Sequence, residues 1–158
     1  DKYPETLLMY KHLIEKQKPE LDILYIADSS TNFPLKAHCI DLHLDFFAAN
    51  EHNFYHNTFL YERMTPFLKE HADLIGTYFY FSHAQKSMRS LLSQYPECSA
   101  NNFSLSYFKN SLAESDFILK DCESLDAVTD SGNNLGFGFH QKGEKMYLMP
   151  YYAQKTGQ

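Results

Sequence analysis

Eight histidines are the most obvious candidates in this sequence for metal binding or proton transfer. His52 and His56 lie four residues apart, the spacing of a ligand pair on one face of a helix. The residue after His52 is Asn53 rather than Glu, so the helical zinc-protease motif is absent. His38 and His43, five residues apart, form a weaker pattern. We therefore expect ordinary surface histidines and no bound metal.

Glycines and nucleophiles give equally little support for catalysis. A Gly-x-Gly lies within residues 135–139, but phosphate-binding glycines join a strand to a helix, and the residues that follow have the pattern of a hairpin. Glycines in a strand mark close packing. No Gly-x-Ser-x-Gly occurs, and Asp41 with Asp45, or Glu62 with Lys69, are expected on solvated faces. The sequence thus predicts a protein that is not an enzyme and has no cofactor.

Residues 74–82 carry the clearest pattern, a strand with two different faces. Side chains alternate across a strand, so Ile75, Phe79 and Phe81 share an apolar face that we expect to pack on the N-terminal helix. The opposite face holds hydroxyls beside Gly76 and could border a small pocket. An alternative is an ordinary core face with tyrosine hydroxyls at its rim. The predicted ligand-binding residues are Tyr78, Tyr80, Tyr107, Phe137, Phe139 and Tyr147.

Composition narrows the class of protein. A length of 158 residues suits one domain, and a formal charge of −6 argues against nucleic-acid binding. No apolar run is long enough to span a membrane, and no signal peptide is visible. Because the chain starts at Asp1, we expect a mature or excised fragment. Cys98 and Cys122 could pair in an oxidising compartment, although buried free thiols are the alternative that we favour for all three cysteines.

Helical spacing comes first and strand-like alternation later, which favours an α+β fold. Pro4 suits the first turn of the first helix, and Pro19 should interrupt it. Residues 1–34 are expected to form an N-terminal helix, in one structural unit with a module at 35–158. The first helix is predicted at 4–18 and resumes after Pro19, from residue 21 to about 30. The other predicted helices are 35–49, 55–71, 85–94 and 104–121, and the predicted strands are 74–82, 135–140 and 145–151.

Three segments resemble a known family. The first is Glu20-Leu21-Asp22-Ile23-Leu24-Tyr25-Ile26-Ala27, running into Phe33-Pro34-Leu35-Lys36. The second is Pro66-Phe67-Leu68-Lys69-Glu70-His71-Ala72 followed by the strand at 74–81, and the third is Tyr147-Leu148-Met149-Pro150-Tyr151. Together they resemble the extracytoplasmic double-Cache sensor region of membrane-bound AraC-type regulators and histidine kinases. The Arg- and Trp-bearing pocket signature of its amino-acid-binding members is absent.

The resemblance implies a PAS-like antiparallel sheet packed on a long N-terminal helix. It implies a ligand-sensing domain of a signal-transduction or transcription-regulatory protein, extracytoplasmic and membrane-tethered in its parent. The implied partners are a small-molecule ligand and a second copy through the N-terminal helix, with no nucleic acid. A secreted or periplasmic interaction module of the inhibitor or immunity type is the alternative, and a small cytosolic enzyme ranks last.

Overall fold

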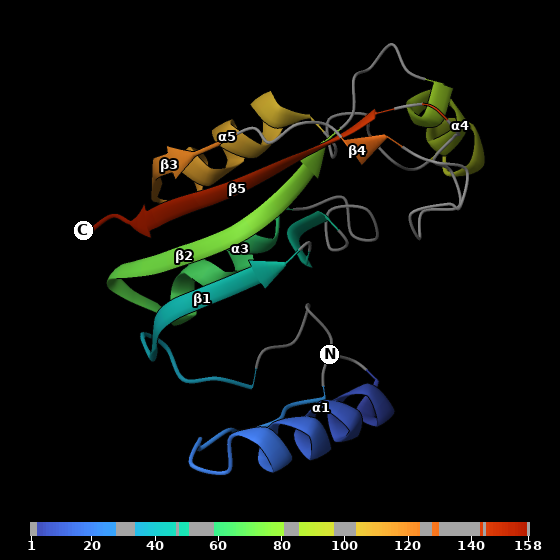
Figure 1. The fold of residues 1–158 in the computed structure, drawn as a ribbon. Helices are drawn as coiled ribbons and strands as arrows, with labels where there is room; N and C mark the ends of the chain where they lie inside the picture. The colour runs from blue at the N-terminus through green and yellow to red at the C-terminus, as the bar shows by residue number, and fades with distance from the viewer. Residues whose placement is uncertain are drawn as a thin grey trace. The chain divides into compact units, whose positions relative to one another are not determined.

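The computed structural model describes residues 3–27, 34–46, 48–50, 59–80, 86–96, 104–123, 128–129, 143 and 145–157 (Figure 1). The chain divides into two compact units, Asp1–Leu35 and Lys36–Gln158. In the first unit, α1 (Pro4–Gln17) begins with Pro4 and buries no residue. The first predicted helix is confirmed, and it ends just before Pro19. The helix predicted to resume at residue 21 is wrong, because residues 21–27 have no regular secondary structure.

The second unit is built on a mixed sheet with the strand order β1-β2-β5-β3 (Figure 1). β1 (Ile40–Phe46) is parallel to β2 (Leu68–Tyr80), whereas β5 (Lys145–Lys155) is antiparallel to both β2 and β3 (Phe117–Cys122). A short β4 (Val128–Thr129) also pairs with β5. The parallel pair is incompatible with the predicted PAS-like antiparallel sheet, and the α+β prediction is wrong. A parallel pair requires a crossover connection, which is typical of α/β folds.

β1 replaces the helix predicted at 35–49. The helical prediction depended on Ile40, Leu44 and Phe47, spaced four and three apart. The same run also alternates: Leu42, Leu44 and Phe46 are exposed, while Asp45 is buried. A short run satisfies both periods, and pairing with β2 decides in favour of the strand.

The helix predicted at 55–71 is shorter than expected. α3 (Leu60–Met64) continues into the 3-10 helix η1 (Thr65–Phe67), and β2 starts at Leu68, six residues before the predicted strand. Pro66 lies inside η1 and cannot donate a helical hydrogen bond. The helix predicted at 85–94 is confirmed as α4 (Lys86–Gln94).

The helix predicted at 104–121 divides into α5 (Leu105–Glu114) and β3. Ser104 caps α5 as predicted, because its hydroxyl accepts the backbone N–H of Tyr107 at 3.4 Å. Asp116 has a positive φ of 64°, which turns the chain from helix to strand. Of the predicted late hairpin, 145–151 is a strand, whereas 135–140 lies outside the described residues.

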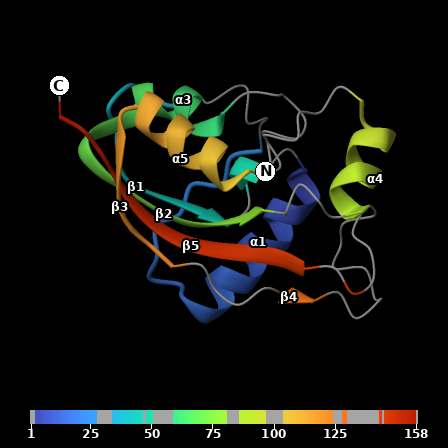
Figure 2. The same cartoon turned by 90° about the horizontal axis from the view of Figure 1, so that it is seen from above.

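α3 and α5 cover the same face of the sheet (Figure 2). The core lies between them and β2, β5 and β3. Tyr78 stacks on Phe108 with ring centroids 4.2 Å apart, and Phe108 also meets Tyr61 and Tyr151 edge-on. The largest fully buried side chains are Tyr61, Leu68, Leu74, Tyr78, Phe108, Leu112, Met149 and Asn50.

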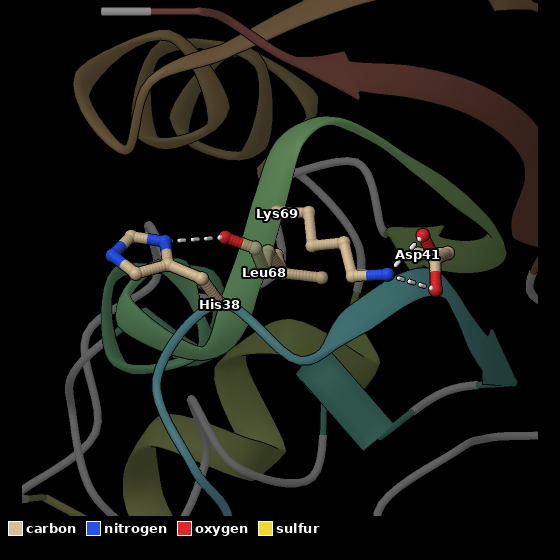
Figure 3. Close-up of polar contacts among 4 residues, drawn as sticks. All are labelled: His38, Asp41, Leu68 and Lys69. Atoms are coloured by element: carbon tan, nitrogen blue, oxygen red, sulfur yellow. Dashed lines mark hydrogen bonds and ion pairs between the residues drawn. The ribbon is translucent and has the colours of Figure 1, made fainter.

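The starts of β1 and β2 are joined by two polar contacts (Figure 3). The His38 ring contacts the Leu68 carbonyl oxygen at 3.3 Å through Nδ1. Lys69 donates to both carboxylate oxygens of Asp41 at 2.7 and 2.8 Å. Both side chains of this ion pair are exposed, so it aligns the strands at little gain in stability.

Candidate functional site

In open α/β sheets, ligands bind outside the carboxyl ends of the parallel strands. Here those ends are Phe46 of β1 and Tyr80 of β2. We call the described residues at this place the carboxyl edge, namely 45–46, 48–50 and 79–80. Two buried polar side chains hold it together, one from Asp45 and one from Asn50.

Asp45 is 1% exposed and is surrounded by donors. Its carboxylate accepts the backbone N–H of Ala48 at 2.6 Å and that of Ala49 at 3.0 Å, so it caps the helical turn at 48–50. The hydroxyl of Tyr61 donates to the same carboxylate and is also hydrogen bonded to the hydroxyl of Tyr151. Both carboxylate oxygens therefore have hydrogen-bond partners within the protein.

Burial dominates the ionisation of this cluster. It raises the pKa of Asp45, and the Tyr61 hydroxyl, the neighbouring His43 and the two backbone donors oppose that rise. Burial likewise raises the pKa of Tyr61 and of Tyr151 well above the usual range. Both phenols remain protonated at neutral pH and act as donors, so the cluster joins α3 to β1 and β5 rather than supplying a base.

Gly76 makes this cluster sterically feasible. It pairs with Asp45 on β1 and with Tyr151 on β5, so the three residues form one row across the sheet. A Cβ at position 76 would overlap the Asp45 carbonyl oxygen and the Tyr151 hydroxyl. The gap that the sequence predicted as a pocket border is filled by the phenol of Tyr151.

Asn50 joins the turn after β1 to the end of β2. Its amide nitrogen donates to the Phe79 carbonyl at 2.9 Å, and its amide oxygen accepts the Phe79 N–H at 3.0 Å. The side chain is 1% exposed. Neither Asn50 nor Tyr61 was predicted as a site residue, because only tertiary contacts bring them together with Asp45.

The predicted ligand-binding residues do not form one group. Tyr78 lies in the core, and Tyr107 is half-buried, with its ring edge-on to Phe59. Tyr80 and Tyr147 are both half-buried and stack at 5.2 Å with an interplanar angle of 13°. Phe137 and Phe139 lie outside the described residues. The ligand-binding role of the set stays a prediction.

The other candidates are placed only in part. His43 is half-buried, and its Nε2 has no hydrogen-bond partner among the described residues. His52, His56 and Cys98 lie outside the described ranges. Within the described part of the chain, no three His, Cys, Asp or Glu side chains are placed to hold a metal. The helices described there are also too short or too polar to cross a bilayer.

Comparison with known proteins gives a likeness of fold. No protein family description and no curated protein matches the sequence. Among solved structures, the MccD protein superposes with a TM-score of 0.71 at 12% identity, over 99% of this chain and 78% of its own. A SAM-dependent methyltransferase from Methanosarcina mazei gives 0.68 at 12% identity, over 100% and 81%. The (4+2) cyclase SpnF gives 0.65 at 9% identity, over 99% and 64%.

These likenesses overturn the sensor interpretation. The resemblance to double-Cache regions is wrong, because the structural neighbours are proteins of the methyltransferase fold. The predictions that followed from it are wrong for the same reason: a sensing or immunity-type function, a chain that is not an enzyme, and membrane-anchored partners with a helix-mediated dimer. The extracytoplasmic location stays untested. The chain has an α/β fold similar to that of S-adenosylmethionine (SAM)-dependent methyltransferases.

Proposed function

We propose that this chain functions in a SAM-dependent methyltransferase, an enzyme that transfers a methyl group to a small-molecule acceptor. The observation that carries the proposal is the agreement in fold over nearly the whole chain with a SAM-dependent methyltransferase. The parallel pair β1–β2 supports it, because such pairs place a ligand at their carboxyl ends. Fold alone does not fix chemistry, as the cyclase among the structural neighbours illustrates.

The described residues do not themselves fit the cofactor. In nucleotide-binding sheets an acidic side chain near a strand end holds the ribose, but the Asp45 carboxylate is already occupied by Ala48, Ala49 and Tyr61. A glycine-rich turn between a strand and a helix is the second recurring element. The first glycine of the sequence is Gly76, inside β2. We therefore assign no cofactor contact to the described residues and no reaction step to the cofactor.

The stacked pair Tyr80–Tyr147 is the part of this edge best suited to an acceptor. Both rings are half-buried, and Tyr80 is the last residue of β2. Aromatic walls supply contact area, and phenol hydroxyls can orient a ligand. We propose that these two rings form one wall of the acceptor site.

Methyl transfer is tested with the full-length protein, SAM carrying a labelled methyl group, and a panel of small-molecule acceptors. The proposal expects saturable SAM binding in calorimetry and transfer of label to at least one acceptor. Tyr147→Ala should raise the acceptor KM, while Tyr152→Ala, on the same strand, should not. Binding of SAM without transfer to any acceptor would overturn methyl transfer, and no binding would overturn the cofactor as well.

A further inference from the structure

We infer that Asn50 is a positioning residue that holds the carboxyl edge in its working geometry. The inference rests on the proposed function, because it assigns a role at the edge where that function places the ligand. It concerns the turn at 48–50, which follows β1, and the last two residues of β2, Phe79 and Tyr80.

The strand register explains why an amide is needed at position 50. β1 pairs with β2 up to Phe46 opposite Thr77, and no later residue of β1 continues the ladder. Two residues further along β2, the Asn50 side chain accepts the N–H and donates to the carbonyl of Phe79. A carboxamide carries one acceptor and a donor group, as a peptide unit does. Asn50 thus extends the sheet by one rung after the main chain of β1 has turned away.

A second contact makes the arrangement rigid. The Asp45 carboxylate fixes the backbone N–H groups of Ala48 and Ala49, so the turn that carries Asn50 is held at both ends. Asp45 and Asn50 are each 1% exposed, where water cannot replace a lost partner. Loss of the Asn50 amide would free the turn to shift against Tyr80. A displacement of about 1 Å at a reacting site can cost roughly a hundredfold in rate.

The matched control lies at the opposite end of β2. The Thr65 hydroxyl donates to the Ser115 or Tyr61 carbonyl, at 3.0 and 2.8 Å, just before the strand begins. Thr65→Val removes a part-buried hydrogen bond from a side chain to a backbone carbonyl without touching the carboxyl edge. Asn50→Ala should lose more thermal stability than Thr65→Val, because it removes two fully buried hydrogen bonds. Asn50→Ala should lower kcat/KM for methyl transfer by roughly tenfold or more, and Thr65→Val should change it less than about twofold.

Asn50→Asp supplies a conservative rescue. An ionised carboxylate would face the Phe79 carbonyl with no proton to donate, whereas a protonated carboxyl can accept and donate as the amide does. Its activity relative to the wild type should rise as the pH falls from 8 to 5, and that of Asn50→Ala should not. The titratable neighbours Asp45, His43, Tyr61 and Tyr151 are common to all variants, so each is compared with the wild type at the same pH.

Hydrogen exchange provides a readout that does not depend on activity. The Phe79 amide should exchange faster in Asn50→Ala and remain protected in Thr65→Val. Equal activity of Asn50→Ala and the wild type, or an equal activity loss in both variants, would overturn the positioning role. Absence of methyl transfer by the wild-type protein would instead overturn the proposed function, together with any positioning role in it. Faster exchange of the Phe79 amide in Asn50→Ala would then still confirm the hydrogen bond between Asn50 and Phe79.

Discussion

The hydroxyl of Tyr151 occupies the space directly above Gly76, so that a Cβ at that position would overlap it. Tyr151 and Gly76 are register partners on β5 and β2, and Asp45 lies opposite Gly76 on β1. Tyr61 reaches the row from α3 through the Tyr151 hydroxyl and the Asp45 carboxylate. The missing side chain of Gly76 thus leaves room for a hydrogen-bonded cluster that joins α3 to β1 and β5.

Gly76→Ala should destabilise the protein by about 1–3 kcal/mol, the usual cost of overpacking a core. Urea unfolding at neutral pH measures the change in free energy. Combined with Tyr151→Phe, which removes the overlapped hydroxyl, Gly76→Ala should cost less than it does alone, because the two residues are in contact. Strict additivity of the two substitutions would contradict the steric relationship.

Asp45→Asn should alter how stability depends on pH. Burial raises the Asp45 pKa above the ordinary value of an aspartate, so its contribution to stability is complete below that ordinary value and is lost as the pH rises through the higher pKa of the folded protein. Asparagine does not titrate. The substitution also removes the Asp45 charge, which raises the His43 pKa against the lowering by burial. The His43 pKa should therefore fall further in Asp45→Asn, and a lowered histidine pKa makes stability rise with pH.

In Asp45→Asn, the loss of the Asp45 titration and the lower His43 pKa both make the unfolding free energy rise more steeply with pH. The slope of unfolding free energy against pH should become more positive than in the wild type between about pH 4 and 6.5. Urea titrations at half-unit pH steps measure the slope, with the exposed Asp41→Asn as a control expected to change it little. Parallel curves for Asp45→Asn and the wild type would show that Asp45 has the same pKa in the folded and unfolded protein.

The two faces of β2 should respond differently to truncation. Tyr78 is fully buried and stacks on Phe108, so Tyr78→Ala should cost about 3–5 kcal/mol. Ile75, which is 43% exposed, should cost about 1 kcal/mol or less when replaced by Ala. Thermal and urea unfolding measure both. A larger loss for Ile75→Ala than for Tyr78→Ala would mean that the faces are reversed.

Substitutions of two lysines near the start of β2 should show that a buried hydrogen-bonded lysine contributes more to stability than a lysine in a surface ion pair. Lys69 pairs with Asp41 at the surface, so Lys69→Met should change stability by less than about 1 kcal/mol. Lys155 is 7% exposed and its Nζ donates to the carbonyls of Thr65 and Leu68, both at 3.0 Å. Lys155→Met should cost about 1.5–3 kcal/mol, and equal effects of the two substitutions would refute this distinction.

Local sequence signals predicted part of the fold. α1, α4, the cap at Ser104 and the strand through Tyr78 follow from proline placement, capping chemistry and alternation. β1 could not be distinguished from a helix, because Ile40, Leu44 and Phe47 have helical spacing while Leu42, Leu44 and Phe46 alternate. Its parallel pairing with β2 is a contact between segments 28 residues or more apart, such as Ile40 with Leu68, and no local signal specifies it.

The candidate site was harder to predict from the sequence than the fold. Alternation correctly placed Tyr78 with Gly76, but hydroxyls on that face suggested a pocket wall, whereas the fully buried Tyr78 stacks on Phe108. Asp45 was expected in solvent because charged residues usually are. Only the donors supplied by Tyr61 and the turn after β1 make its burial tolerable.

Calorimetric titration of the full-length protein with SAM is the decisive measurement for the proposed function, because methyl transfer requires the protein to bind the methyl donor. We expect saturable binding of SAM with one site per chain. No heat of binding for either SAM or its demethylated product, with the wild-type protein shown to be folded, would contradict it.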